Sequence, residues 1–159
     1  MRKTLISIIF FRLLFAAELK TPAEFLGYEL GDYFTPHHKV VSYFEYVSNQ
    51  EPNIRTVVYG ETYERRPLMT AIISSELNMN TLEDLRIDNL KRAGILKGKP
   101  SDRKIGIVWL SYNVHGNEAN STEAAMKTLH ALADKNNKST QKYNNESKHN
   151  NYVWRWGWS

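Results

Sequence analysis

The sequence contains no cysteine among its 159 residues. This absence excludes a disulfide scaffold, a thiol nucleophile and a thiolate metal site, because each of them needs that side chain. Long apolar runs are also missing, since none approaches the roughly 20 residues that a membrane-spanning helix requires. We therefore expect no stable membrane span.

Excess charge of one sign is missing from most of the chain. Residues 1–134 carry 16 basic and 16 acidic side chains, although the formal net charge of the whole chain is +4. The excess lies in residues 135–159, where five basic residues stand against Glu146. A nucleic-acid footprint should lie on a folded face or a regular helix. We therefore do not expect nucleic acid as a partner.

The N-terminus has the pattern of a secretory signal peptide. Arg2 and Lys3 precede an apolar run over residues 5–15, and two alanines follow at positions 16 and 17. A short basic region, about ten apolar residues and small residues at the end are typical of such a signal. Residues 1–17 are therefore predicted to be a signal peptide, and the protein to be secreted or periplasmic. The alternative is a buried or frayed N-terminal helix.

Hydrophobic periodicity predicts three helices. Thr35 and Pro36 are suitable as N-cap and first residue of a helix that ends near residue 48. Thr81 and Asp84 have capping-box-like spacing before a second helix, and Gly94 is suited to its C-terminal end. A third helix is predicted to end near residue 134.

The predicted strands complete an α/β fold. Two β-rich segments, residues 54–59 and 67–74, flank a polar turn and predict a hairpin. Residues 105–110 are almost continuously apolar, which is typical of a central strand buried on both faces. The order of elements predicts a partial mixed sheet with helices on its faces.

Residues 135–159 differ in composition from the rest. They contain six asparagines, and Trp154, Trp156 and Trp158 alternate near the end. The alternation is compatible with an edge strand, but no neighbouring pattern supplies a sheet for it. We therefore predict a basic, Asn-rich tail that is disordered or foreign to the domain.

His115 and Glu118 form the chemical signal of the sequence. They follow the apolar strand, and sites in open α/β sheets form beyond the carboxyl ends of strands. Side chains three residues apart can meet within one helical turn, and an imidazole with a carboxylate can bind zinc. Gly116 is predicted to allow a tight turn between them. By spacing alone, a surface histidine beside a capping glutamate is the alternative.

Two segments resemble the front part of the zinc carboxypeptidases, the M14 peptidase family. They are Gly60-Glu-Thr-Tyr-Glu-Arg-Arg-Pro-Leu68 and Ser111-Tyr-Asn-Val-His-Gly-Asn-Glu-Ala119. The resemblance implies a truncated zinc-carboxypeptidase-like domain over residues 18–134, which binds zinc and the C-terminus of a peptide or protein substrate. It makes His115 and Glu118 zinc ligands and places Arg66 near the substrate cleft. Arg65 departs from the pattern, because glycine is usual there; Thr62 replaces the usual serine.

The family's third zinc ligand and its general base come further downstream, and no residue here is assigned to either. His130, on the last predicted helix, is interpreted as an ordinary histidine; His149 lies in the tail, and His37 and His38 are expected to be solvated. The chain is therefore predicted to be an incomplete copy with unknown catalytic residues. An unpaired sheet edge and partly exposed apolar faces on residues 105–110 and the last helix are also expected.

Two other functions stay open. Aspartoacylase-like zinc amidohydrolases also resemble the chain at His115–Glu118, although the segment at residues 60–68 favours the peptidase. A non-catalytic binding module is the third possibility, and it predicts no stoichiometric zinc.

Overall fold

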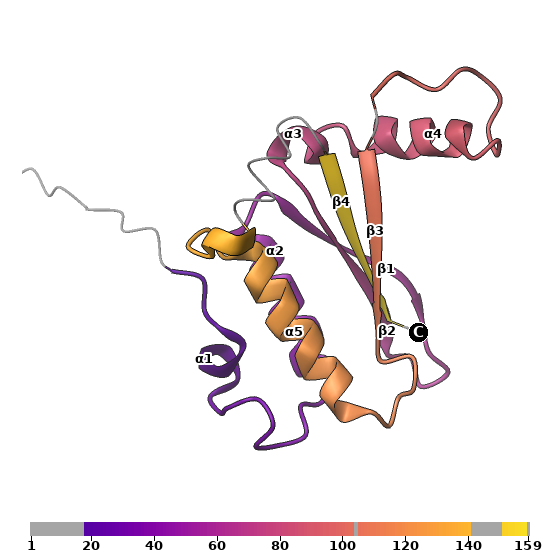
Figure 1. Ribbon diagram of the computed structural model, residues 1–159. Coiled ribbons are helices and arrows are strands. Elements are labelled where there is room, and N and C mark those ends of the chain that lie inside the picture. The colour runs from indigo at the N-terminus through magenta and orange to yellow at the C-terminus, as the bar shows by residue number, and fades with distance from the viewer. Residues whose placement is uncertain (1–17, 104, 141–150, 159) are drawn as a thin grey trace, which may run out of the picture.

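The computed structural model describes residues 18–103, 105–140 and 151–158. Their four strands form one sheet in the order β1-β2-β4-β3 (Figure 1). The strands are β1 (Ile54–Glu61), β2 (Pro67–Ile73), β3 (Ile105–Tyr112) and β4 (Asn151–Trp158). The helices are α1 (Pro22–Leu26), α2 (His37–Gln50), α3 (Glu76–Met79), α4 (Leu82–Arg92) and α5 (Ala119–Ala133). The predicted α/β class and mixed sheet are confirmed.

The predicted hairpin is present. Strands β1 and β2 pair antiparallel from Ile54 opposite Ile73 to Glu61 opposite Pro67, with an irregularity between Val58 and Gly60. The β-branched residues of β1 suit this pleated backbone. The short polar connection between the strands fixes the register, and it places two arginines at the tip of the hairpin.

Strand β4 occupies a position that the sequence did not indicate. It lies between β2 and β3, antiparallel to the former and parallel to the latter, where Arg155 is opposite both Ile72 and Trp109. The prediction of a disordered tail is therefore wrong for residues 151–158. The reason is that the partners of this strand lie 46 to 83 residues earlier in the sequence, beyond the reach of any local pattern. The division of the chain into domains stays a prediction.

Strand β3 lies at the edge of the sheet rather than at its centre, which corrects the prediction of burial on both faces. Ile107 and Trp109 are 45% and 50% exposed. Leu110 and Tyr112, on the other face, pack against the core. The apolar run therefore has one buried face and one open face, in agreement with the expected partial exposure of residues 105–110.

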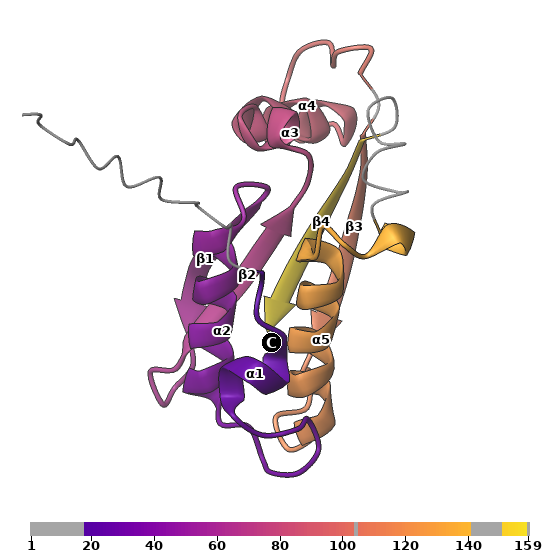
Figure 2. The same ribbon diagram turned by 90° about the vertical axis from the view of Figure 1, so that its left-hand side faces the viewer.

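Helices α2 and α5 lie side by side over one face of the sheet (Figure 2). Their apolar stripes bury Val40, Tyr43, Phe44 and Val47 of α2, and Ala125, Met126, Leu129, Leu132 and Ala133 of α5. These residues form one core with Met69, Ala71 and Ile73 of β2. The apolar stripe of α5 is buried, so the expected exposure of the last helix is wrong.

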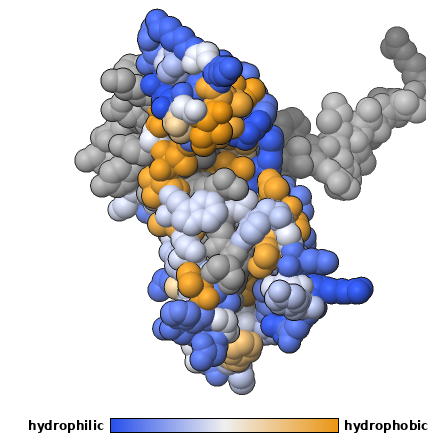
Figure 3. Space-filling model, turned by 90° about the vertical axis from the view of Figure 1, so that its right-hand side faces the viewer, coloured by the Kyte–Doolittle hydropathy of each residue, from blue (hydrophilic) through white to orange (hydrophobic). Residues whose placement is uncertain are grey.

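The opposite face of the sheet is open. Figure 3 shows several apolar groups on this side of the molecule, with less hydrophobic and grey atoms between them. Val57 and Tyr59 of β1 belong to this face, together with Ile107 and Trp109 of β3, and each of them is at least 39% exposed. In the described part of the chain, the helices α3 and α4 lie at one end of the sheet and leave this face uncovered (Figure 1).

The helix caps differ from the predictions in two places. Helix α2 begins at His37 with Pro36 as its N-cap, so Thr35 does not cap it. The hydroxyl of Thr81 donates to the carbonyl of Leu77 instead of capping α4, because the unpredicted short helix α3 directly precedes α4. Gly94 follows α4 with a φ of 72°, the left-handed conformation that ends many helices, as predicted.

Residues 135–140 stay attached to the end of α5. The side chains of Asn137 and Thr140 both donate hydrogen bonds to the carbonyl oxygen of Ala131. This part of the predicted tail therefore satisfies a free carbonyl of the last helical turn. The predicted signal peptide and His149 lie outside the described residues. Within the described part, no helix has the length and apolar character needed to cross a membrane.

Candidate metal centre

His115 and Glu118 lie together in the loop between β3 and α5. The His115 Nδ1 atom is 3.1 Å from Glu118 Oε1, and the side chains are 69% and 57% exposed. The backbone N–H of Glu118 donates to the carbonyl of His115 at 3.0 Å, which closes the turn that brings them together. The structure therefore places the two predicted ligands side by side and open to solvent.

Asn113 anchors the start of this loop in a left-handed conformation, with a φ of 58°. Its backbone N–H donates to Ser121 Oγ at 2.6 Å, and its side-chain oxygen accepts a hydrogen bond from Thr122 Oγ1 at 3.3 Å. Asparagine tolerates this conformation better than most residues. The first turns of α5 thus hold the loop in place.

Gly116 does not have the special role that the sequence suggested. Its φ lies outside the left-handed region, and a Cβ atom there would meet nothing within 4 Å. The residue of this loop with a left-handed conformation is Asn113, at its start. The two side chains lie together, as predicted from their spacing, whereas the sequence did not indicate the left-handed residue of the loop.

The pair has the chemistry and spacing of two zinc ligands. Zinc binds imidazole nitrogen and carboxylate oxygen at about 2.0–2.2 Å, so two ligands in a tetrahedral site lie about 3.3 Å apart. The observed separation of 3.1 Å is close to that value. Among the described residues, however, no group of three His, Cys, Asp or Glu side chains is placed to hold a metal. The described residues therefore fit two positions of a zinc site and leave the third without a ligand.

His130 is not the missing ligand. It lies twelve residues beyond Glu118 in sequence, close to the far end of α5. At 1.5 Å per helical residue the separation is about 18 Å. Its Nε2 atom lies 3.4 Å from the carbonyl oxygen of Leu19. The interpretation of His130 as an ordinary histidine is confirmed.

A cavity of about 660 Å³ opens beside the pair. Its walls come from the segment before α2, the first turns of α2, the hairpin tip and the loop after β3. The lining residues are Phe34, Thr35, Pro36, His37, His38, Val41, Ser42, Thr62, Arg65, Arg66, Pro67, Leu68, Asn113, Gly116 and Thr122. Arg66 and Gly116 both belong to this wall. The substrate residue and the metal loop that the sequence singled out therefore border one cavity.

The hairpin tip is held rigidly by its own hydrogen bonds. The N–H of Thr62 donates to the carbonyl of Arg66 at 2.9 Å, and the N–H of Arg66 donates to Thr62 Oγ1 at 3.1 Å. Arg65 has a φ of 59°. Glu64 forms an ion pair with Arg66. Threonine in place of the usual serine keeps the hydroxyl that this turn uses.

His37 is half-buried in the cavity wall, so the expectation that it is solvated is wrong. Burial, and then the positive charge of Arg66, lower the pKa of His37 below its ordinary value of 6.5. Its imidazole is therefore mainly neutral at pH 7. His38, the next residue, is exposed as expected.

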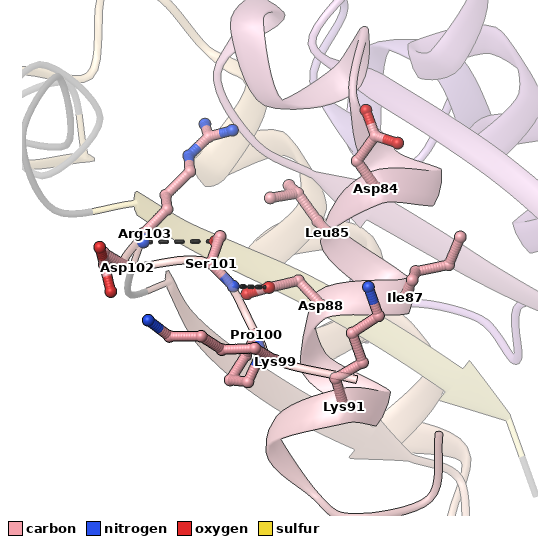
Figure 4. A pocket seen from close by; sticks show the side chains of 10 residues that line it. All are labelled: Asp84, Leu85, Ile87, Asp88, Lys91, Lys99, Pro100, Ser101, Asp102 and Arg103. Carbon is pink, nitrogen blue, oxygen red and sulfur yellow. Dashed lines mark hydrogen bonds between the residues drawn. The ribbon is translucent and has the colours of Figure 1, made fainter. Parts of the chain in front are cut away.

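A second cavity, of about 580 Å³, lies between α4 and residues 99–103, away from the metal loop (Figure 4). Asp88 accepts a hydrogen bond from the backbone N–H of Ser101, which lowers the pKa of that carboxyl. Arg92 pairs with Asp88 at 3.1 Å and donates to the carbonyls of Ser101 and Arg103. These bonds fasten the loop to the helix. They account for the polar side chains here as structural groups.

A buried polar contact near the candidate site was also missed. Thr35 and Glu123 are 3% and 9% exposed and are hydrogen-bonded to each other. The one signal in the sequence is that Glu123 lies among the residues of the apolar side of α5. A carboxylate that is buried there needs a hydrogen-bonding partner.

The sequence model of the zinc carboxypeptidases, peptidase family M14, matches residues 40–149. No curated protein and no solved structure matched the chain. The family match includes the hairpin tip, the His115–Glu118 loop and all of α5. The chain therefore belongs to the M14 family of zinc carboxypeptidases.

Proposed function

We propose that this chain forms part of the cleft of a metallocarboxypeptidase, with His115 and Glu118 as zinc ligands and Arg66 as a substrate-binding residue. The observation that carries the proposal is the 3.1 Å contact between the two ligand side chains, beside a cavity bordered by Arg66 and Gly116. Family membership supports a peptide substrate, and our proposal places the C-terminus of a peptide or protein in this cleft. The basic and apolar start of the sequence favours a secreted or periplasmic protein.

A bound zinc ion would lower the pKa of its water and polarise the scissile carbonyl. The residues of this chain would hold the ion and the peptide. Arg66 pairs with Glu64 in this structure, and its guanidinium would exchange that exposed partner for two parallel hydrogen bonds to a substrate carboxylate. The described residues supply neither a third ligand nor a carboxylate placed as a base. We therefore expect the chain to take up zinc at the His115–Glu118 pair, and we expect these residues alone to support only slow peptide hydrolysis.

The first experiment measures zinc in the purified chain by elemental analysis after dialysis against a zinc-containing buffer. The variant His115→Ala is compared with the wild type, and His130→Ala serves as the matched control. Close to one zinc per chain in the wild type and the control, and its loss in His115→Ala, would support the proposal. Absence of zinc from all three would contradict it and favour the non-catalytic binding module.

A further inference from the structure

Arg65 has an unfavourable backbone conformation at the tip of the hairpin. Its φ of 59° lies in the left-handed region, where the side chain of an L-residue crowds the following carbonyl. Glycine and asparagine adopt this conformation at lower cost. A strained residue of this kind, beside a candidate site, suggests that its side chain has a function there.

The cavity beside the zinc loop has a one-sided charge. Arg65 and Arg66 line it, together with His37 and His38, and none of its lining residues is acidic. Glu64 already pairs with Arg66. In the described part of the chain, the guanidinium of Arg65 has no carboxylate partner. The permanent positive charge of the wall therefore comes from the two arginines, and no described carboxylate compensates that of Arg65.

The remaining walls suit a short acidic side chain. Val41 and Leu68 supply apolar surface, while Ser42, Thr62 and Asn113 supply polar groups. A carboxylate on a stem of one or two methylenes could place the methylenes against the apolar wall. Its oxygens could then accept two parallel hydrogen bonds from a guanidinium.

We propose that this cavity binds an acidic side chain of the peptide substrate, and that Arg65 is the specificity-determining residue. The inference rests on the proposed function only in taking a peptide as the ligand. It adds a preference for aspartate or glutamate, and a position for that side chain between the hairpin tip and α2.

The test is a binding measurement on the full chain, which needs no turnover. Two fluorescein-labelled hexapeptides with free C-termini are compared by fluorescence anisotropy, with and without EDTA. One contains glutamate at three positions and the other glutamine at the same positions. We expect the glutamate peptide to bind about tenfold more tightly in low salt, because a charged hydrogen-bonding partner is worth about one order of magnitude. The preference should shrink in high salt.

Arg65→Gly separates this role from a structural one. Glycine relieves the left-handed strain, so the melting temperature should stay the same or rise, while the preference for glutamate falls about tenfold. Arg65→Lys keeps a positive charge and should keep part of the preference. Arg86→Gln removes an exposed arginine of α4 that pairs with Glu83, and it should keep the full preference.

The outcomes discriminate between the two proposals. Equal binding of both peptides by the wild type would overturn the specificity while leaving the cleft function intact. A folded Arg65→Gly variant with undiminished preference would overturn the role of Arg65. No binding of either peptide would overturn both the inference and the proposed cleft. A preference that persists in EDTA and disappears only in Arg65→Gly would establish the inference independently of zinc.

Discussion

The hydroxyl of Thr35 donates a 2.6 Å hydrogen bond to the carboxylate of Glu123, across 88 residues of sequence. The hydroxyl of Tyr28 lies 3.0 Å from the same threonine oxygen. Because Thr35 gives its only proton to Glu123, Tyr28 is the donor in the second contact. The two bonds join the segment before α2 to the start of α5, and so connect the cavity wall to the helix that follows the His115–Glu118 loop.

Replacing Thr35 with valine should destabilise the fold by about 2–3 kcal/mol, because it leaves the buried carboxylate of Glu123 without its donor. Thr35→Ser keeps the hydroxyl and should cost less than about 1 kcal/mol. Urea unfolding followed by circular dichroism measures both values. Equal free energies of unfolding for the valine and serine variants would contradict the importance of this bond.

The position of His37 predicts a pH dependence of stability. Burial lowers its pKa in the folded state, so the unfolded chain binds protons more readily. The contribution of His37 to stability is therefore complete above its ordinary pKa of about 6.5 and declines as the pH falls below it. His37→Gln should weaken the loss of stability between pH 7 and pH 5, measured by urea unfolding.

The neighbours of His37 provide the control. Arg66 and His38 are the charged or titratable groups that act on its imidazole. Arg66→Gln should raise the pKa of His37 toward its ordinary value, which an NMR titration of the imidazole protons would detect. A pKa of His37 at or above 6.5 in the wild type would contradict the observed burial.

The two faces of β3 should respond differently to charge. Ile107 is 45% exposed on the open face, so Ile107→Lys should change the free energy of unfolding by no more than about 0.5 kcal/mol. It should also reduce the binding of the apolar dye ANS and the tendency to aggregate. Leu110 packs against the core, so Leu110→Lys should cost about 3 kcal/mol. Equal sensitivity at the two positions would contradict the one-sided burial of the strand.

Proline in β4 tests its place between two strands. Arg155 is opposite Ile72 on one side and Trp109 on the other. Arg155→Pro removes a backbone donor in the interior of the sheet and should destabilise the fold by about 3 kcal/mol. Arg155→Ala, which keeps the N–H, is the control. If the proline variant unfolds like the alanine variant, the tail is disordered as the sequence first indicated.

Local patterns predicted the elements whose partners are close in sequence. The hairpin of β1 and β2 and the helices α2, α4 and α5 were found from periodicity and turn residues, because these signals act within a few residues. The proximity of His115 and Glu118 was also predictable, since three residues and one turn bring their side chains together. The family resemblance was confirmed by the match over residues 40–149.

The features that the sequence did not predict depend on partners that are distant in the chain. The continuous apolar run of β3 resembles that of a central strand, and only the arrangement of the other strands decides that it lies at the edge. The same holds for Thr35, whose preference for a helix cap was overridden by the buried carboxylate of Glu123. The strain at Arg65 had one signal, because the resembling family usually has glycine at that position and glycine favours a positive φ. The place of the side chain in the cavity wall, however, could not be predicted from the sequence.

The insertion of β4 between β2 and β3 also has a consequence for the order of folding. The hairpin needs only a short turn and can form within microseconds. The four-stranded sheet, however, is complete only when residues 151–158 pair with residues 67–73 on one side and with residues 105–112 on the other. Contacts between such distant segments form slowly. Until then β2 and β3 each expose an edge with unpaired backbone groups. Refolding at high protein concentration should therefore favour aggregation over the native state.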